Sequence, residues 1–261
     1  MRDGSTRQLY VEEHGEGEPL LLIEGLGQSM WAWREQAPAF SERYRTITYD
    51  ARGTGRSAVP GEPYGIDDLA SDAADVLDGR RAHVVGLSMG GYTALTLALA
   101  RPELVRSLVL AGTGAGGADR VPRPQEIRDA YAAAVGLPFD EYGRTTMPMT
   151  FSPGWAERNS ERFEESLAAR GEHPTPDVTL DAHLQVCYGF YNRGTEVERI
   201  DTPALVLHGD ADVVVPVENG RMLASRLPNA RYVELPGLGH NLQLEDPETF
   251  NRHVLEFLEL T

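Results

Sequence analysis

The residue pattern with the clearest chemical meaning is Gly86-Leu87-Ser88-Met89-Gly90, which fits G-x-S-x-G. An apolar run at 82–85 precedes the motif and a helical pattern at 89–100 follows it. In such a strand–turn–helix setting the serine lies on a sharp turn, and its hydroxyl is exposed as a nucleophile. Glycines are needed because the turn is strained and the chain passes close to itself. A serine that only caps a helix is the alternative, and the setting favours the nucleophile.

A serine hydroxyl needs a general base, which in this arrangement comes late in the chain. His240 fits because it follows the glycine-containing loop 235–239, directly after a strand-like run at 231–235. The other histidines lie in an N-terminal turn, within or at the end of strand-like runs, or in helical segments: His14, His83, His173, His183, His208 and His253. We therefore predict His240 as the base.

The imidazole in turn needs a carboxylate that fixes its tautomer and stabilises its cation. The loop after the apolar run 204–207 offers Asp210 and Asp212. Asp212 lies further out, where a neighbouring loop is easier to reach, whereas Asp210 is better placed to shape the turn. We predict a triad of Ser88, Asp212 and His240, in which the carboxylate comes between serine and histidine in the chain.

Two backbone N–H groups should stabilise the negative oxygen that forms when the serine attacks a carbonyl. One is that of Met89, directly after the nucleophile. The other should come from the loop after an earlier strand, here Glu24-Gly25-Leu26-Gly27-Gln28, and we predict the N–H of Leu26. Its glycines let the backbone approach a substrate closely, although a tight turn into the next helix would also explain them.

The elements that must position these residues alternate along the chain. Strand-like runs occur at 9–12, 19–23, 44–49, 82–85, 105–110, 204–207 and 231–235, and helical patterns at 31–40, 66–77, 89–100, 217–227 and 247–258. This alternation predicts a mostly parallel sheet with helices on both faces. The segment 114–198 lacks strand-like runs, so we expect a helical cap there and a core made of 1–113 and 199–261.

Composition limits the classes of function. The 261 residues carry a net charge of −16, which disfavours nucleic acid and anionic lipid as partners. Apolar runs are too short to span a bilayer and no secretory leader is evident, so we expect a cytoplasmic protein. Cys187 is the only cysteine and is expected to be a buried structural thiol. No metal-ligand spacing is present, and nothing indicates an oligomeric state.

Four ordered segments resemble the α/β-hydrolase superfamily: Gly25-Leu26-Gly27, Asp50-Ala51-Arg52-Gly53-Thr54-Gly55-Arg56-Ser57, the Ser88 turn, and the Asp212 loop followed by Gly239-His240. The chain is most similar to the branch of small lactonases, esterases and cofactor-free haloperoxidases, which includes 3-oxoadipate enol-lactonases. The resemblance implies about eight strands, a helical cap between the sixth and seventh, and no cofactor. Many members have histidine where this chain has Glu24.

The resemblance and the triad together imply acyl transfer through an acyl-enzyme on Ser88. The expected substrate is a small molecule, a small-to-medium and partly hydrophobic ester or lactone. Gly25, Trp31, Met147 and Trp155 are candidates for contact with it, although aromatic side chains in a helical insertion more often form local core. C–C bond hydrolysis, perhydrolysis by the same triad, and a ligand-binding receptor that retained the fold remain alternatives.

Overall fold

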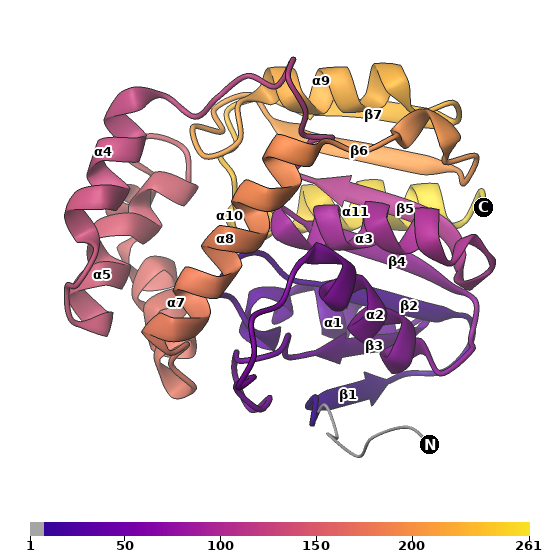
Figure 1. Cartoon of the computed structure of the whole chain (residues 1–261), viewed down its shortest axis with the longest axis horizontal. Helices are drawn as coiled ribbons and strands as arrows, with labels where there is room; N and C mark the ends of the chain where they lie inside the picture. Colours follow the sequence, from indigo (N-terminus) through magenta and orange to yellow (C-terminus); the bar gives the residue numbers. More distant parts are fainter. Residues whose placement is uncertain (1–7) are drawn as a thin grey trace.

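The computed structural model describes residues 8–261 and contains a seven-stranded sheet (Figure 1). The strands are β1 (Val11–His14), β2 (Pro19–Ile23), β3 (Arg45–Tyr49), β4 (Ala82–Leu87), β5 (Val105–Ala111), β6 (Ala204–Gly209) and β7 (Ala230–Leu235). Their order is β1-β3-β2-β4-β5-β6-β7. β1 runs antiparallel to β3, and every other pair in the described sheet is parallel.

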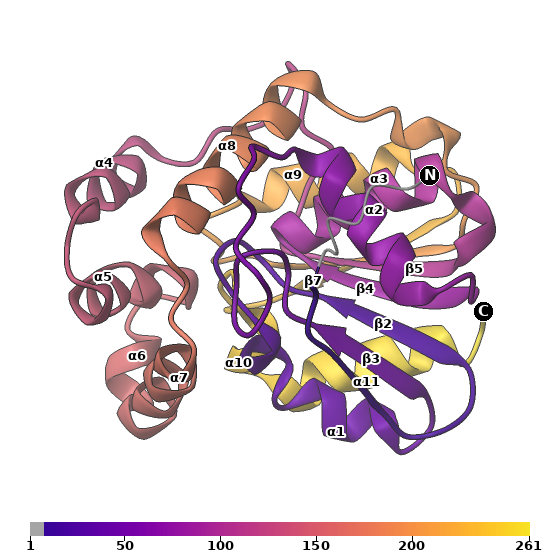
Figure 2. The same ribbon diagram turned by 60° about the horizontal axis from the view of Figure 1, so that its bottom comes forward.

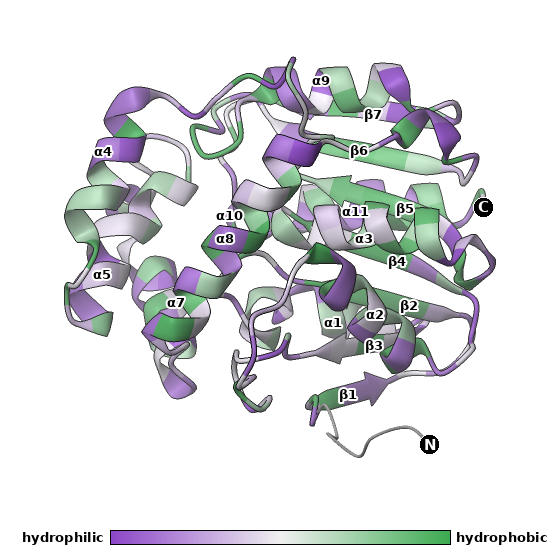
Figure 3. Ribbon diagram, in the orientation of Figure 1, coloured by the Kyte–Doolittle hydropathy of each residue, from purple (hydrophilic) through white to green (hydrophobic). Residues whose placement is uncertain are grey.

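Helices cover both faces of this sheet, as Figure 2 shows. One face packs against α2 (Ile66–Leu77), α3 (Met89–Ala100) and α9 (Val217–Arg226). The other face packs against α1 (Gln36–Ser41) and α11 (Pro247–Leu258). Along β2, Leu21 and Ile23 point to the first face, while Leu20 and Leu22 point to the second. Burial on both faces explains why the inner strands are continuous apolar runs (Figure 3).

Shorter helices complete the core and position its loops. These are η1 (Met30–Trp33), η2 (Pro102–Leu104), η4 (Val197–Arg199) and α10 (Leu242–Glu245). The helix expected at 31–40 is divided into η1 and α1, because residues 34 and 35 form a turn between them. α10 was not expected from the sequence, and it follows directly after the loop that carries His240.

The segment between β5 and β6 is helical and contains no strand within the described residues. It consists of α4 (Gln125–Ala134), α5 (Phe139–Thr146), η3 (Met147–Thr150), α6 (Trp155–Arg158), α7 (Ser160–Glu172) and α8 (Asp177–Arg193). α4 to α7 lie beside the sheet, and α8 runs diagonally back to it (Figure 1). Val186 and Phe190 of α8 are buried in the same cluster as α2 and α3, so the end of this helix is part of the main core.

The sheet differs in count from the one implied by the family resemblance. The structure has seven strands over residues 8–261, where about eight were expected, and the insertion follows the fifth of them rather than the sixth. The strand-like runs in the sequence also number seven, so sequence and structure agree on the count within residues 8–261.

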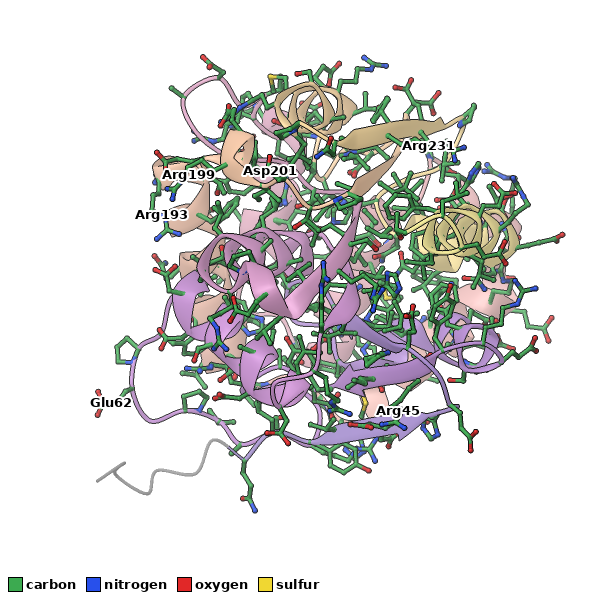
Figure 4. The ribbon with its side chains drawn as sticks, turned by 90° about the vertical axis from the view of Figure 1, so that its right-hand side faces the viewer. Arg45, Glu62, Arg193, Arg199, Asp201 and Arg231 are labelled. Atoms are coloured by element: carbon green, nitrogen blue, oxygen red, sulfur yellow. The ribbon has the colours of Figure 1, made fainter. Side chains whose placement is uncertain are left out.

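The end of the molecule opposite the inserted helices is rich in charged side chains. Figure 4 views the molecule from this side, and its labelled side chains are exposed: Arg45, Glu62, Arg193, Arg199, Asp201 and Arg231.

Within residues 8–261, no helix combines the length and the apolar character needed to cross a bilayer.

Candidate active site

Ser88 lies on the turn between β4 and α3 in a strained backbone conformation. Its φ of 53° and ψ of −115° are unfavourable for a residue with a side chain. The turn is packed tightly against β2, because a Cβ on Gly90 would lie 2.1 Å from the Ile23 carbonyl oxygen. A Cβ on Gly86 would lie 2.4 Å from the Gly90 carbonyl oxygen. Both glycines are therefore required for the turn that the G-x-S-x-G pattern predicts.

Asp212 and His240 meet at the carboxyl ends of β6 and β7. Asp212 Oδ2 lies 2.7 Å from His240 Nδ1, and Asp212 Oδ1 accepts hydrogen bonds from the N–H groups of Val214 and Val215, at 2.8 Å each. Burial opposes ionisation of this carboxyl, but the imidazoles of His240 and His208 outweigh it and hold the pKa of Asp212 well below its ordinary value. The carboxylate is therefore ionised across the working range of an imidazole base.

Asp210, the other carboxylate considered for this role, has a different partner. Its Oδ1 accepts a hydrogen bond of 2.6 Å from Gly237 N–H, and the residue is exposed. It ties the loop after β6 to the loop after β7, which is the turn-shaping role expected of it.

His208 is a second imidazole on the same carboxylate, which the sequence did not reveal. Its Nε2 lies 2.8 Å from Val215 O and 3.2 Å from Asp212 Oδ2, and the residue is fully buried. Gly220 makes room for the ring, because a Cβ there would lie 2.3 Å from His208 Nδ1. The sequence analysis assigned His208 to packing at the end of a strand. Its spacing of four residues before Asp212 was the only signal of this contact.

The end of β5 brings Ser88 and His240 towards each other. Ser88 N–H donates to Ala111 O at 2.9 Å, and a Cβ on the next residue, Gly112, would lie 3.2 Å from His240 Nδ1. Within the described residues the Ser88 hydroxyl makes no hydrogen bond. It is thus free to donate to the imidazole, and such contacts are often loose before a substrate binds.

The loop after β2 leaves one N–H group without a partner beside Ser88. Gly25 N–H donates to Gln28 Oε1 at 3.0 Å, and Gly27 N–H donates to His183 Nδ1 of α8 at 3.1 Å. Leu26 N–H, between them, donates no hydrogen bond within residues 8–261. A Cβ on Gly25 would lie 3.4 Å from Ser88 Cβ, so this loop approaches the nucleophile closely.

Met89 supplies the second N–H group considered for the oxyanion. It is the first residue of α3, so its N–H has no acceptor within the helix. The start of a helix also carries a partial positive charge. The free N–H groups of Leu26 and Met89 thus come from the loop after β2 and from the start of α3, and their role as oxyanion donors stays a prediction.

A chain of side-chain hydrogen bonds connects the loop after β2 to the loop that carries His240. Gln28 Nε2 donates to Asn241 Oδ1 at 3.2 Å, and Asn241 Nδ2 donates to Thr150 Oγ1 at 2.7 Å. Asn241 N–H also donates to Thr150 O at 2.7 Å. Glu245 accepts hydrogen bonds from Gly239 N–H, at 2.8 Å, and from the hydroxyl of Ser152. Both sides of the site are thus tied to the inserted segment.

We expect Gln28→Met to lower kcat by roughly tenfold, because it removes two neutral hydrogen bonds of up to about 1.5 kcal/mol each. Methionine has a similar volume, but it cannot accept a hydrogen bond from Gly25 N–H or donate one to Asn241 Oδ1. Steady-state kinetics on one ester will measure the effect, and Gln125→Met, at an exposed position of α4, is the matched control. A loss confined to KM would contradict a role in aligning the loop.

Glu24, which stands where many family members have histidine, is buried and 1% exposed. Its Oε1 accepts a hydrogen bond of 2.7 Å from Ala51 N–H, while Oε2 is buried without a partner. Burial raises the pKa of Glu24 well above its ordinary value, although backbone hydrogen bonds act in the opposite direction. This shift favours the protonated carboxyl, which carries no negative charge into the loop that contains Gly25 and Leu26.

Glu24→Gln should change how stability depends on pH. As pH rises above about 4.5, the Glu24 carboxyl loses its proton in the unfolded chain before it does so in the folded protein. The free energy of unfolding then falls by about 1.4 kcal/mol per pH unit until the folded carboxyl ionises. The glutamine variant does not have this ionisable carboxyl, so we expect its stability advantage over the native protein to grow as the pH rises above about 4.5. Urea unfolding at several pH values measures this, with exposed Glu16→Gln as control.

The aromatic and methionine candidates for substrate contact lie in a separate apolar cluster. Met147 and Trp155 are each 6% exposed, and Trp155 stacks on Phe151 with ring centroids 4.2 Å apart. Trp31 is partly buried against this cluster, which also contains Leu244 of α10. These side chains therefore pack the inserted helices against the core, and their contact with substrate stays a prediction.

Cys187, on α8, was expected to be buried; it is partly buried and packs against the main core. Burial raises its pKa to about 12, so the thiol is protonated and a poor nucleophile.

Comparison with known proteins identifies the family of the chain. Residues 18–247 match the family model described as alpha/beta hydrolase fold. A relative from Caulobacter segnis named "Putative carbamate hydrolase RutD" is 34% identical over an alignment of 270 positions, which covers 99% of each chain. The enol-lactonase of Burkholderia xenovorans has a TM-score of 0.81 at 27% identity and 96% coverage of both chains. A Mycobacterium tuberculosis protein called "Putative non-heme bromoperoxidase BpoC" also has a TM-score of 0.81, at 31% identity. The match covers 96% of this chain and 95% of that protein.

Proposed function

Because the chain belongs to the α/β-hydrolase family and is a hydrolase of that fold, we propose that it cleaves a small-to-medium, partly hydrophobic carboxylic ester or lactone through an acyl-enzyme on Ser88. The observation that carries the proposal is the buried hydrogen bond between Asp212 and His240, beside a serine held at positive φ. The enol-lactonase likeness supports a lactone or ester as the substrate class.

In the proposed reaction, His240 takes the Ser88 hydroxyl proton as the oxygen attacks the carbonyl carbon. The Leu26 and Met89 N–H groups donate to the negative oxygen, and each such donor lowers the barrier by roughly 3 kcal/mol. Collapse of the tetrahedral intermediate breaks the carbon–oxygen bond, and His240 gives its proton to the leaving alcohol. Water, deprotonated by the same imidazole, then releases the acid and restores the serine.

Asp212 and His208 act on the base and do not touch the substrate in this scheme. Asp212 fixes the tautomer in which Nδ1 carries the proton, which leaves Nε2 of His240 free to accept one from Ser88. His208 lies against the same Asp212 oxygen that binds His240. We propose that it restricts the position of this carboxylate.

A carbamate is a second candidate substrate, because the Caulobacter segnis relative carries that activity in its name. The same attack by Ser88 would release an alcohol and leave a carbamoyl-enzyme, so the residues needed are identical. The two candidates differ only in the group bonded to the carbonyl carbon.

The test is a panel of substrates of matched size: a 4-nitrophenyl ester, a five-membered lactone and a 4-nitrophenyl carbamate. We expect the native protein to have its largest kcat/KM on the ester or the lactone. The Ser88→Ala variant should show no measurable turnover of any of the three substrates. A larger kcat/KM on the carbamate would favour the second candidate. Cleavage of a 1,5-diketone, or peracid formation from acetate and hydrogen peroxide, would favour the other reactions open to this triad. Labelling of Ser88 by a fluorophosphonate without turnover of any substrate would contradict the proposal and favour a receptor.

A further inference from the structure

Gly27, in the loop after β2, is held on both sides by side chains of the inserted segment. Its N–H donates to Nδ1 of His183, on α8, at 3.1 Å. Its carbonyl oxygen accepts a hydrogen bond of 3.0 Å from the hydroxyl of Thr175, two residues before α8. His183 is fully buried and Thr175 is 5% exposed, so water competes little for either contact. The backbone of Gly27 is therefore fixed relative to the start of α8.

The same residue is packed so closely that only glycine fits. Its φ is 65°, in the left-handed region, and a Cβ there would lie 2.4 Å from Leu180 Cδ2. Leu180 lies on α8, three residues before His183. The helix thus contacts Gly27 through a hydrogen bond and through an apolar side chain.

The N–H group of Leu26 lies between two peptide groups that are each held in place. Gln28 N–H donates to Gly25 O at 3.2 Å, and this oxygen belongs to the same peptide group as Leu26 N–H. Because N–H and C=O of a trans peptide point to opposite sides, Leu26 N–H points away from the turn. The next peptide group contains Gly27 N–H, which His183 holds. The orientation of the Leu26 N–H group thus depends on Gln28 on one side and on His183 on the other.

His183 can accept this hydrogen bond only while its ring is neutral. Burial lowers the pKa of His183 to about 4, a hydrogen bond with the Arg52 backbone opposes this, and the Arg52 charge adds to it. Two further groups face the ring from outside α8. The Tyr64 ring meets it edge-on with centroids 6.0 Å apart, and Asp72 Oδ2 binds Arg52 Nε at 2.6 Å. At neutral pH the ring is therefore uncharged, with the proton on Nε2 and an acceptor at Nδ1.

The loop held in this way lies against the nucleophile. A Cβ on Gly25 would lie 3.4 Å from Ser88 Cβ, and Leu26 N–H donates no hydrogen bond within residues 8–261. A free N–H group beside a nucleophile stabilises an oxyanion only if it is oriented before the reaction begins. Anchoring of α8 alone does not require these contacts, because Val186 and Phe190 already bury the helix in the main core.

We propose that His183 is a positioning residue for acyl transfer: it holds Gly27, and through Gly27 the Leu26 N–H group, in the orientation that binds the oxyanion. Thr175 fixes the other side of the same glycine. This inference rests on the proposed function and adds to it two residues outside the triad. His183 does not touch the substrate in this scheme, and it acts only through the backbone of the loop after β2.

The test compares His183→Leu with His183→Asn, two variants of equal shape. Both lose the ring, but only asparagine has an acceptor, Oδ1, bonded to Cγ as Nδ1 is. Loss of a whole oxyanion donor costs about 10²- to 10³-fold, so we expect kcat on a 4-nitrophenyl ester to fall roughly 10- to 100-fold in His183→Leu. His183→Asn should stay within about fivefold of the native kcat, and KM should change less than about threefold in both. Equal losses of kcat would overturn the inference, because loss of the ring's packing is common to both variants.

Val186→Ala controls for a general loosening of α8. Val186 lies three residues after His183 on the same helix and is 3% exposed. Removal of its methyl groups should lower the midpoint of thermal unfolding but change kcat by less than about twofold. A fall in kcat as large as that of His183→Leu would show that the stability of α8 governs the rate, and the role of His183 would fail.

Two measurements without turnover separate this inference from the proposed function. Butylboronic acid bonds to Ser88 Oγ and places a boron-bound oxygen at the oxyanion position, so its dissociation constant should rise in His183→Leu far more than in His183→Asn. Amide hydrogen exchange at Gly27 should accelerate by about tenfold or more in His183→Leu only. If these differences appear but no ester, lactone or carbamate is turned over, the proposed function fails and the role of His183 stands. If His183→Leu keeps native turnover and boronate affinity, only the role of His183 fails.

Discussion

Ser88→Ala is expected to lower kcat for any ester or lactone by at least about 10⁴-fold, because members of a triad act as a unit and loss of the nucleophile removes nearly all of its contribution. The change deletes only a hydroxyl that has no hydrogen bond within the described residues. The fold should therefore be preserved, with a thermal midpoint close to that of the native protein, since alanine keeps the Cβ and the strained backbone of this position.

The measurement is steady-state turnover combined with mass spectrometry after treatment with a fluorophosphonate. The native protein should gain one label, on the peptide that contains Ser88, and the variant none. Ser225→Ala, at an exposed position of α9, is the matched control and should behave as the native protein does. A Ser88→Ala variant that keeps native activity would remove the basis of the proposed function.

Asp212→Asn should lower kcat by about 10⁴-fold while KM changes little, because the amide stabilises the wrong tautomer of the neighbouring imidazole. The Val214 and Val215 N–H groups both require an acceptor, so the amide oxygen should occupy the position of Oδ1. The NH₂ group then faces His240 Nδ1, which must accept. Nε2 becomes protonated and can no longer take the proton of Ser88.

Asp210→Asn provides a matched control two residues away. An asparagine oxygen there can still accept from Gly237 N–H, so we expect less than about a twofold change in kcat. Turnover over a range of pH will distinguish the cases, because only loss of the Asp212 charge should weaken His240 as a base. Equal losses in the two variants would show that the loop after β6 matters as a whole and that Asp212 has no special part.

Much of the core could be predicted because local sequence and tertiary packing agree there. The helices expected at 66–77, 89–100 and 247–258 occur as α2, α3 and α11 with the same limits. They begin after the extended Gly65, after the strained Ser88 and at Pro247, respectively. The inner strands were evident because burial on both faces favours mostly apolar residues.

Elements that depend on contacts distant in sequence were harder to predict. The break between η1 and α1 was missed, and Trp33 and Phe40 on its two sides are both packed in the core. α10 was missed because four residues are too few for a helical pattern. The first strand lies at Val11–His14 instead of 9–12, since its register is set by pairing with β3.

The sequence suggested the triad because motif, spacing and chain order all point to the same residues. It could not suggest Gln28, Asn241 or Thr175, whose partners lie far away in the chain. An isolated polar residue in a loop has no pattern, and its role depends on where the backbone places it.

Helix α8 belongs to the inserted segment, but it also contacts the loop after β2 and the main core. Through His183, α8 accepts a hydrogen bond from Gly27 N–H, one residue after the Leu26 amide proposed for the oxyanion. Further along, Phe190 anchors the same helix in the main core. An engineer who transplants the whole insertion from a relative would therefore also replace a support of the carbonyl-activating loop. Chimeras that exchange only α4 to α7 should alter selectivity at a smaller cost in rate, which makes the start of α8 the natural splice point.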